Sequence, residues 1–326
     1  MPTALAVPAD PWLLDCRGRT LDCRPGAGPA HVVGVLNVTP DSFSDGGRYT
    51  SVQAAVDRAG EMAQEGAAVV DVGGESTRPA GAAYGPGAQA VTLDDELARV
   101  VPVVEALARA LPHLLLSVDT TKGAVAREAL RAGAHLVNDV RGLRGGTGTA
   151  RAAADYGAPL IVMHSSGGPG AMPHEHTGSP TGGTAGDIVE TVARGLAASV
   201  AAAEAAGVRH IVVDAGFGFG KTPAENLRLI GHTAALVAAL SRPVMVGVSR
   251  KHTVGVVLGS AAAPAAVGAR LVGSLGLAAV AVLGGECLVR THDVRATAEL
   301  LRTLAAVADA SAPDAQAGRS HGGRDR

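Results

Sequence analysis

The fold is indicated by one strand–helix–strand unit: Ala68-Val69-Val70-Asp71-Val72, the stretch Leu93–Ala110, and Leu114-Leu115-Leu116-Ser117-Val118. Both short runs are almost continuously apolar, which is typical of parallel strands that are buried on both faces. The stretch between them has the length and the alanine and leucine content of a helix. The unit therefore predicts a β/α architecture with a parallel sheet.

The same unit repeats along the chain. The predicted strands are His31–Leu36, Ala68–Val72, Leu114–Val118, His135–Asn138, Pro159–Met163, His210–Val213, Val244–Val248 and Glu286–Val289. The predicted helices are Val52–Glu65, Leu93–Ala110, Gly123–Ala132, Ile188–Ala206, Ala224–Leu240 and Arg295–Ala308. Eight strands separated by helical stretches predict a single (β/α)8 TIM barrel, and a doubly wound open sheet is the alternative.

The two ends of the chain lie outside the predicted barrel, which spans residues 31–310. Within residues 1–30, the segment Leu14–Cys23 resembles a β-hairpin with its turn at Arg17-Gly18, and we expect it to cap the bottom of the barrel. Residues 311–326 have almost no apolar content, so this tail is expected to be disordered. We expect neither end to carry chemistry.

Composition argues against several classes of protein. With 28 basic and 30 acidic side chains the formal net charge is −2, and no basic stripe indicates nucleic-acid binding. The sequence contains no run of about 18 apolar residues, so no membrane span is expected. The first residues lack the basic region of a signal peptide. Cys16, Cys23 and Cys287 lack metal-site spacing, which favours a reducing cytoplasm; a Cys16–Cys23 disulfide is the less favoured alternative.

Polar side chains follow all eight predicted strands, at the positions where barrel enzymes place their reacting groups. They are Asn37–Gly47, Asp71–Pro79, Ser117–Thr120, Asn138-Asp139, His164, Asp214, Ser249–His252 and Arg290–Asp293. Eight polar strand ends are hard to ascribe to solvation alone. The pattern predicts an active site at the carboxyl ends of the strands.

The residue types at these strand ends indicate two kinds of chemistry. Hydrogen-bond acceptors suit a flat ligand with several N–H groups, and they are Asp119, Asn138 and Asp214, of which the asparagine is also a donor. Cationic side chains suit an oxyanion or a phosphate, and they are Lys251, Arg290 and His292. The oxygen ligands of Asn37 and Asp45 suit Mg²⁺ that is shared with phosphate oxygens.

Structural roles are open alternatives for several of these side chains. Asp119 or Asp139 can cap the helix that follows, and His164 can be a core histidine whose hydrogen bonds are satisfied. Arg78 and Arg290 can be surface guanidinium groups. Asp214 is a weaker candidate for capping because Ala215-Gly216 does not begin a helix directly.

The glycine-rich stretch Ala215–Thr222 follows a strand and resembles a phosphate-binding loop, so a nucleotide hydrolase is a rival interpretation. Phe217 and Phe219 would crowd a loop whose bare amides must surround phosphates, and Pro223 follows at once. The chain has only three phenylalanines, and all three lie in polar, glycine-rich segments. This placement favours a stacking surface for a ligand.

The motifs resemble those of the dihydropteroate synthase family from roughly His31 to Leu301. The matching segments are Asn37–Gly47, Asp71–Pro79, Ser117–Thr120, Val137–Val140, Met163-His164, Asp214–Lys221, Ser249–Lys251 and Arg290–Val294. The resemblance implies transfer of a dihydropterin methyl carbon from its diphosphate to the amine of 4-aminobenzoate, in folate synthesis. It also implies a homodimer.

The resemblance further implies a role for each matching residue. The pterin would contact Asp119, Asn138, Asp214 and Lys251; the diphosphate would contact Arg290, His292 and Asn37, with Mg²⁺ at Asn37 and Asp45. The 4-aminobenzoate pocket would consist of Phe43, Thr77, Arg78, Pro79, Phe219 and Ser249. We expect Lys251, Asp214, Arg290, His292 and Asp45 to act in catalysis, with departure of the diphosphate before attack by the amine.

The chain departs from the family pattern at two places. Ala215 stands where the family usually has proline, and Ala80–Gly85 looks like an extra segment beside the predicted 4-aminobenzoate pocket. A tolerated surface insertion is one interpretation of the second departure, since longer loops cost little. The other is that Tyr84 reshapes the pocket and alters sensitivity to sulfonamides.

Two other functions compete with the leading one. A pterin-binding methyltransferase on the same barrel would keep the acceptors but would not need Lys251, Arg290, His292 or the Asn37–Gly47 loop. A non-catalytic paralogue that binds a ligand or partner should have lost residues of the first two loops, and these are present.

Overall fold

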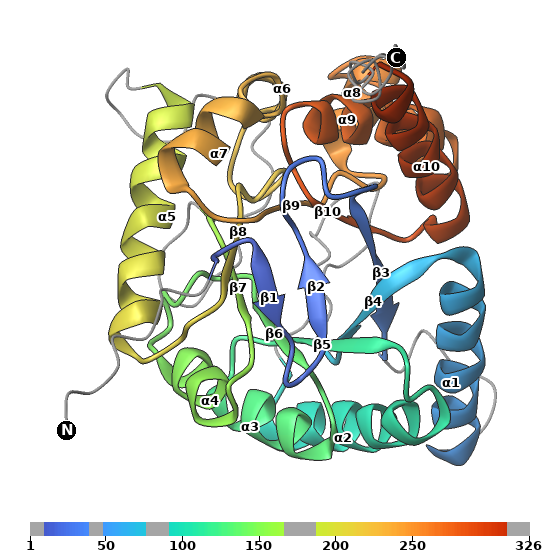
Figure 1. The fold of residues 1–326 in the computed structure, drawn as a ribbon. Coiled ribbons are helices and arrows are strands. Elements are labelled where there is room, and N and C mark those ends of the chain that lie inside the picture. The colour runs from blue at the N-terminus through green and yellow to red at the C-terminus, as the bar shows by residue number, and fades with distance from the viewer. Residues whose placement is uncertain (1–9, 39–47, 76–90, 166–186, 312–326) are drawn as a thin grey trace, which may run out of the picture.

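The computed structural model describes residues 10–38, 48–75, 91–165 and 187–311, and its centre is a closed barrel (Figure 1). The eight strands are parallel and follow the order β10-β3-β4-β5-β6-β7-β8-β9. Their bounds are β3 His31–Asn37, β4 Ala67–Gly73, β5 Leu115–Asp119, β6 Leu136–Asp139, β7 Leu160–Met163, β8 Ile211–Asp214, β9 Val244–Val246 and β10 Leu288–Thr291. The predicted barrel is confirmed, and every predicted strand overlaps an observed one.

Helices surround the barrel (Figure 1). They are α1 Arg48–Glu65, α2 Leu93–Ala110, α3 Gly123–Ala132, α4 Gly148–Tyr156, α5 Ile188–Ala205, α6 Pro223–Gly231, α7 Thr233–Leu240, α8 His252–Leu258, η2 Val267–Arg270, α9 Leu271–Leu283 and α10 Val294–Ser311. None of the helices in the described ranges is long and apolar enough to cross a bilayer. The helical patterns at α4, α8 and α9 were not among the predicted ones.

One predicted helix is wrong as a single element. The stretch Ala224–Leu240 divides into α6 and α7, because His232 leaves the helical conformation with φ −121° and ψ 23°. The start of α6 is fixed by a capping box, in which Thr222 and Glu225 each accept a hydrogen bond from the backbone N–H of the other. Pro223 follows at the first helical position, where its missing N–H costs nothing.

Side chains alternate along each strand between the helix layer and the barrel interior. The interior positions begin with one apolar residue from each strand: Val33, Val69, Leu115, Leu136, Ile161, Val212, Met245 and Leu288. These eight residues form a single buried cluster, which we call the floor. The outward positions pack against the helices in a second, larger cluster.

A hairpin of β1 Leu13–Asp15 and β2 Thr20–Asp22 closes the barrel beneath the floor, as predicted. Figure 1 shows the two strands lying across one end of the barrel. Its turn places Arg17 at φ 59° and Gly18 at φ 87°, the two positive values of a tight hairpin turn. The hairpin inserts four buried side chains into the floor cluster, namely Leu14, Cys16, Leu21 and Cys23. All three cysteines of the chain are buried free thiols.

Candidate active site

The interior becomes polar two residues beyond the floor on most strands. The residues at this second interior level are Val35, Asp71, Ser117, Asn138, Met163, Asp214, Gly247 and Arg290. Because the strands are parallel, all of these positions lie toward the carboxyl end of the barrel. The period of two along each strand therefore brings the predicted site residues together at one mouth.

A buried network links four of these strand ends. The Arg290 guanidinium donates from Nε to Asp71 Oδ2 at 2.7 Å and from Nη2 to Asp119 Oδ2 at 2.7 Å. Asn138 Nδ2 donates to the same Asp71 oxygen at 2.9 Å. Asp71 is fully buried and Asn138 is 1% exposed. Arg290 is thus the counter-charge of two buried carboxylates rather than a surface guanidinium.

The electrostatics of the network follow from its burial. Desolvation raises the pKa of Asp119, and the adjacent Arg290 opposes that rise. Desolvation acts to lower the pKa of Arg290, but Asp71 and Asp119 outweigh it and raise the value. Among the buried polar atoms that lack a hydrogen-bond partner in the described part of the chain, three lie on neighbouring strands here: Asp71 Oδ1, Ser117 Oγ and Asn138 Oδ1. Two of these are acceptor oxygens, which can receive N–H groups of a ligand.

Asp214 ends β8 on the opposite side of the mouth. Burial raises the pKa of its carboxyl group, while Lys251 and a 2.7 Å hydrogen bond from the Gly216 amide oppose the rise. Gly216 has φ 67°, and a Cβ atom there would come within 1.8 Å of the His164 carbonyl oxygen. Only glycine fits at this approach, so the loop after β8 is pressed against the end of β7.

Lys221 fastens this loop from inside. Its ammonium donates to the carbonyl oxygens of Gly216 at 2.8 Å, Phe219 at 3.1 Å and His164 at 3.3 Å. The side chain is fully buried, and desolvation lowers its pKa to about 7. A phosphate-binding lysine must point out of its loop toward the ligand, and this one points inward. The geometry argues against the rival interpretation as a nucleotide hydrolase.

Lys251 lies over the aromatic residues of the same loop. Its Nζ atom is 4.3 Å from the centre of the Phe219 ring and 5.9 Å from that of Phe217, and it donates to the Phe217 carbonyl. Phe217 is 2% exposed and belongs to the core, whereas Phe219 is only partly buried. Of the two loop phenylalanines, Phe219 is therefore the one whose ring is available for stacking.

Ser249 and His292 meet at the rim beside Lys251. Ser249 Oγ lies 3.1 Å from His292 Nδ1, and the His292 amide donates to the same hydroxyl at 3.2 Å. Desolvation by the surrounding rim and the nearby Arg290 charge lower the pKa of His292, although its side chain is exposed at the mouth. A neutral imidazole there serves as a hydrogen-bond partner rather than as a fixed cation.

Asn37 is the last residue of β3. A Cβ atom built on Gly73, at the end of β4, would lie 3.7 Å from Asn37 Oδ1 and 3.7 Å from Asp119 Oδ2. Asp45, the second predicted Mg²⁺ ligand, lies outside the described residues, as do Phe43, Thr77, Arg78, Pro79 and the Ala80–Gly85 segment. Among the described residues, no group of three or more histidine, cysteine, aspartate or glutamate side chains could hold a metal ion. A single amide oxygen suits Mg²⁺ only where further oxygens come from elsewhere.

Two alternatives at the strand ends are resolved by the geometry. Asp119 does not cap α3, whose N-terminal cap is Lys122. Asp139 shapes a turn instead of capping a helix at once, since it accepts from the Arg141 amide at 2.9 Å and from Thr149 Oγ1 at 2.6 Å. His164 is partly buried, and its Nδ1 atom has no partner within the described ranges.

Asp71 and Ser117 lie in the predicted strand-end segments, but neither of them was predicted to have a role in the site. The sequence feature that could have identified Asp71 is a single aspartate inside the apolar run Ala67–Gly73. A carboxyl group buried in such a strand needs a cation beside it or must take up a proton. The signal for Ser117 is its position two residues before Asp119 on the same strand, which places both on the interior face.

Comparison with known proteins agrees with this geometry. A family model described as "Pterin binding enzyme" matches residues 33–292. A dihydropteroate synthase of Escherichia coli (strain K12) is 40% identical over 282 residues, which are 86% of this chain and 92% of that protein. The chain belongs to the dihydropteroate synthase family. The resemblance inferred from the motifs is thereby confirmed.

Solved dihydropteroate synthases have the same fold. A Xanthomonas albilineans enzyme with 4-aminobenzoic acid is 41% identical, with a TM-score of 0.77 over 93% of this chain and 99% of that one. The structure of the enzyme from that organism in complex with 7,8-dihydropteroate is 38% identical, with a TM-score of 0.74 over 92% of this chain and 100% of the other. The solved structures thus agree with the family model on the fold of this chain.

Proposed function

We propose that this protein condenses (7,8-dihydropterin-6-yl)methyl diphosphate with 4-aminobenzoate to give 7,8-dihydropteroate and diphosphate, a step of folate synthesis. The observation that carries the proposal is the buried network of Arg290 with Asp71, Asp119 and Asn138, in which Asp71 and Asn138 each keep an acceptor oxygen without a partner among the described residues. Membership of the family supports the same reaction.

The pterin ring is assigned to the acceptor side chains Asp119, Asn138 and Asp214, together with Lys251. A pterin presents several N–H groups along one edge, and buried carboxylate and amide oxygens are its natural complements. Charge-assisted hydrogen bonds of this kind contribute roughly 1.5–3 kcal/mol each where water is excluded. The unpartnered oxygens of Asp71 and Asn138 support this placement.

The diphosphate is assigned to Arg290, His292 and Asn37. Mg²⁺ bound by Asn37 and Asp45 would supply further positive charge to the phosphate oxygens, since amide and carboxylate oxygens are ligands that Mg²⁺ accepts. Arg290 meets both Asp119 and the predicted diphosphate side, so it joins the two halves of the site. We expect positive charge at this position to favour departure of the diphosphate.

The 4-aminobenzoate is assigned to Phe219 and Ser249, together with Phe43, Thr77, Arg78 and Pro79. The Phe219 ring, which faces the Lys251 ammonium, supports an aromatic pocket at this rim. We propose that the diphosphate leaves first and that the carboxylates of Asp119 and Asp214 stabilise the cationic pterin methylene until the amine attacks.

The decisive experiment measures diphosphate release and pterin product with both substrates and then with each substrate omitted. We expect stoichiometric product and diphosphate only when both substrates are present. Asp214→Ala and Lys251→Ala should each lower turnover at least about tenfold, or about 1.4 kcal/mol. Diphosphate release without a pterin adduct, or near-normal turnover in both variants, would contradict the proposal.

A homodimer is proposed for the assembled enzyme. Exposed apolar side chains gather on α8 and α9, namely Val257, Leu258, Val272, Val280 and Leu283, and Val272 and Leu283 are 77% and 75% exposed. Such a surface is typical of an interaction site. Sedimentation should give twice the monomer mass, and Val272→Glu with Leu283→Glu should give the monomer.

Residues 31–310 are proposed as the catalytic barrel domain, with residues 1–30 as its bottom cover and residues 311–326 as a separate tail. A cytoplasmic location is proposed as well. The buried free thiols support it, because they suit a reducing compartment.

A further inference from the structure

The barrel wall between β9 and β10 is held by few backbone hydrogen bonds near the mouth. Their ladder pairs Leu288 with Met245 and Val289 with Val246, and β9 ends there. The chain then runs on through Ser249 and Lys251 beside the end of β10 without further ladder pairs in the described structure. This corner carries Ser249, Lys251 and His292, which are assigned to the substrates, so something other than the ladder must fix it.

Two side-chain links replace the ladder at this corner. Ser249 and His292 are hydrogen-bonded, as described above. The residues that follow them in sequence, Arg250 and Asp293, form a bidentate ion pair. Arg250 donates from Nε to Asp293 Oδ2 at 2.8 Å and from Nη2 to Asp293 Oδ1 at 2.5 Å. The fork of the guanidinium matches the carboxylate, which adds directional restraint as well as attraction. The hydrogen bonds from Arg250 and its charge lower the pKa of Asp293.

The backbone of Arg250 is held in an unusual conformation. Its φ is 55°, a left-handed value that is strained for a residue with a Cβ atom. The surroundings determine this conformation from both sides of the residue. The Arg250 amide donates to Ser274 Oγ at 2.9 Å, and the Arg250 carbonyl accepts from Arg270 Nη1 at 3.0 Å.

The residues that hold Arg250 are themselves fixed. Arg270 is 1% exposed, and its Nε atom donates to the Ala265 carbonyl at 2.8 Å. A Cβ atom on Gly255 would come within 2.7 Å of that Nε atom, so α8 packs directly on the guanidinium. Ser274 Oγ in turn donates to the Arg270 carbonyl at 2.8 Å. The turn at Arg250 is therefore built on a rigid support.

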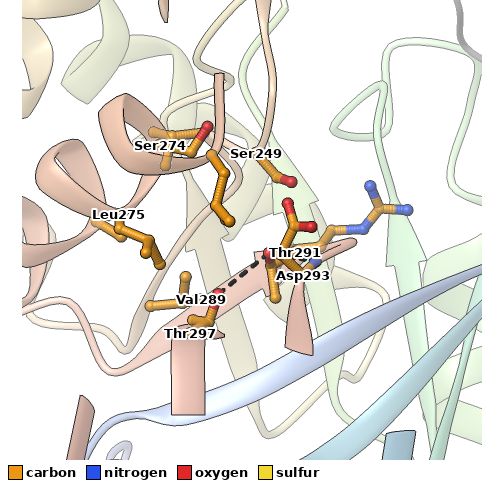
Figure 2. Close-up of a pocket in the computed structure, with 11 residues that line it drawn as sticks. Ser249, Ser274, Leu275, Val289, Thr291, Asp293 and Thr297 are labelled. Carbon is orange, nitrogen blue, oxygen red and sulfur yellow. Dashed lines mark hydrogen bonds between the residues drawn. The ribbon is translucent and has the colours of Figure 1, made fainter. Parts of the chain in front are cut away.

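A small cavity lies behind this corner, with Ser249, Ser274 and Asp293 among the residues that line it (Figure 2). Its volume is about 10 Å³, which leaves space for no more than about one water molecule. Thr291 and Thr297, joined by a 3.2 Å hydrogen bond, also line it. The corner is close-packed, so a change in the ion pair must be transmitted to its neighbours.

We propose that Arg250 and Asp293 are positioning residues, which set Ser249, Lys251 and His292 at the substrate-binding rim. The inference rests on the proposed function, because the substrate-binding roles of Ser249, Lys251 and His292 are part of that proposal. Arg250 lies between two site residues, Ser249 and Lys251. In the structure the Arg250 guanidinium donates to Asp293 and orients the neighbouring residues.

The experiment uses conservative variants of the full chain. Arg250→Lys keeps the charge and loses the fork, and Asp293→Asn keeps the shape and loses the charge. We expect kcat/KM for the pterin diphosphate to fall at least about tenfold in each, because small displacements of binding groups are costly. The kcat/KM of the double variant should be no lower than that of the less active single variant, since both changes remove the same link.

A matched control exists on the outside of the barrel. Arg228 and Asp187 form another bidentate pair, with distances of 3.0 and 2.8 Å between α6 and the start of α5. Arg228→Lys and Asp187→Asn should keep kcat/KM within about twofold of the original protein. All activities are compared well below each variant's own melting temperature, with folding checked by circular dichroism.

A second measurement separates positioning from general weakening of the fold. Calorimetric titration with inorganic diphosphate should show weaker binding to the Arg250 and Asp293 variants and unchanged binding to the controls. An original protein that makes no dihydropteroate overturns the proposed function. An active original protein whose Arg250 and Asp293 variants match the controls in activity and in diphosphate binding overturns the positioning inference alone.

Discussion

The floor and the mouth of the barrel occupy neighbouring interior positions on the same eight strands, and they differ in almost everything else. On β4 the two levels are Val69 and Asp71, and on β10 they are Leu288 and Arg290. The floor cluster is apolar and closed by the hairpin, whereas the mouth contains buried charges that meet across the barrel. Two residues of chain separate a region built for burial from one built for chemistry.

The difference has an energetic meaning. The floor gains free energy from the removal of apolar surface from water, roughly 25 cal/mol per Å². The mouth must offset the cost of desolvating carboxylates, an arginine and a lysine, and buried ion pairs often contribute little net stability. The mouth is therefore expected to depend on matching charges, and the floor on matching volume.

The largest effect is expected from Arg290→Met. This change leaves the carboxyl groups of Asp71 and Asp119 without their partner. Removal of one member of a buried pair typically lowers the free energy of unfolding by about 3–5 kcal/mol. We expect turnover to fall by roughly a thousandfold or more, because the diphosphate side also loses its cation. Chemical denaturation and steady-state kinetics measure the two effects.

The double variant Asp71→Asn with Arg290→Met is the control for that prediction. Neutralising one carboxyl group should restore part of the free energy of unfolding but none of the turnover. If activity returned together with stability, the mouth would depend on packing in the same way as the floor, and the contrast between the two regions would be lost.

The next largest effect is expected at the floor. Leu14 is fully buried in the hairpin, against the floor residues. Leu14→Ala should lower the free energy of unfolding by about 2–5 kcal/mol, the usual range for a buried leucine. At a temperature where the variant is folded, kcat/KM should stay within about twofold of the original value. A loss of activity larger than this would show that the floor shapes the mouth directly.

Much of this arrangement could be predicted from the sequence, because strand identity and interior alternation are local patterns. The apolar runs predicted all eight strands, and the polar residues that follow them predicted the mouth. The hairpin turn was visible in Arg17-Gly18, which both take positive φ. The family followed from motif residues in the correct order.

Other features could not be predicted, because they depend on which strands become neighbours. Arg290 and Asp71 are 219 residues apart in the chain, and no local pattern shows that they form a pair. The sequence separated acceptors for the pterin from cations for the diphosphate, but in the structure Asp119 contacts Arg290 directly. The helices α8 and α9 were missed because glycines interrupt their periodic patterns.

Two glycines with positive φ give an intermediate prediction. Gly18 in the hairpin turn has φ 87° and nothing within 4 Å of an added Cβ atom, whereas at Gly216 the added atom would lie 1.8 Å from a carbonyl oxygen. Gly18→Ala should cost about 1 kcal/mol of stability and leave activity unchanged. Gly216→Ala should displace the loop after β8 and lower kcat/KM about tenfold or more. Equal effects of the two changes on activity would contradict the division between floor and mouth.

The last prediction is a pH dependence of stability that comes from Lys221 in the loop after β8. Burial lowers the pKa of Lys221 from 10.5 to about 7, so between these values the unfolded chain keeps a proton that the folded protein has released. The unfolded state then binds more protons, and the contribution of Lys221 to the free energy of unfolding rises with pH through this window. The slope is at most about 1.4 kcal/mol per pH unit.

Denaturation of the original protein and of Lys221→Met between pH 7 and about 9 tests this pH dependence. The difference between the two should rise with pH, while the difference between the original protein and Leu14→Ala should stay flat, because the leucine carries no proton. A flat Lys221 difference would mean that the three carbonyl oxygens around the ammonium compensate for its burial and keep it charged.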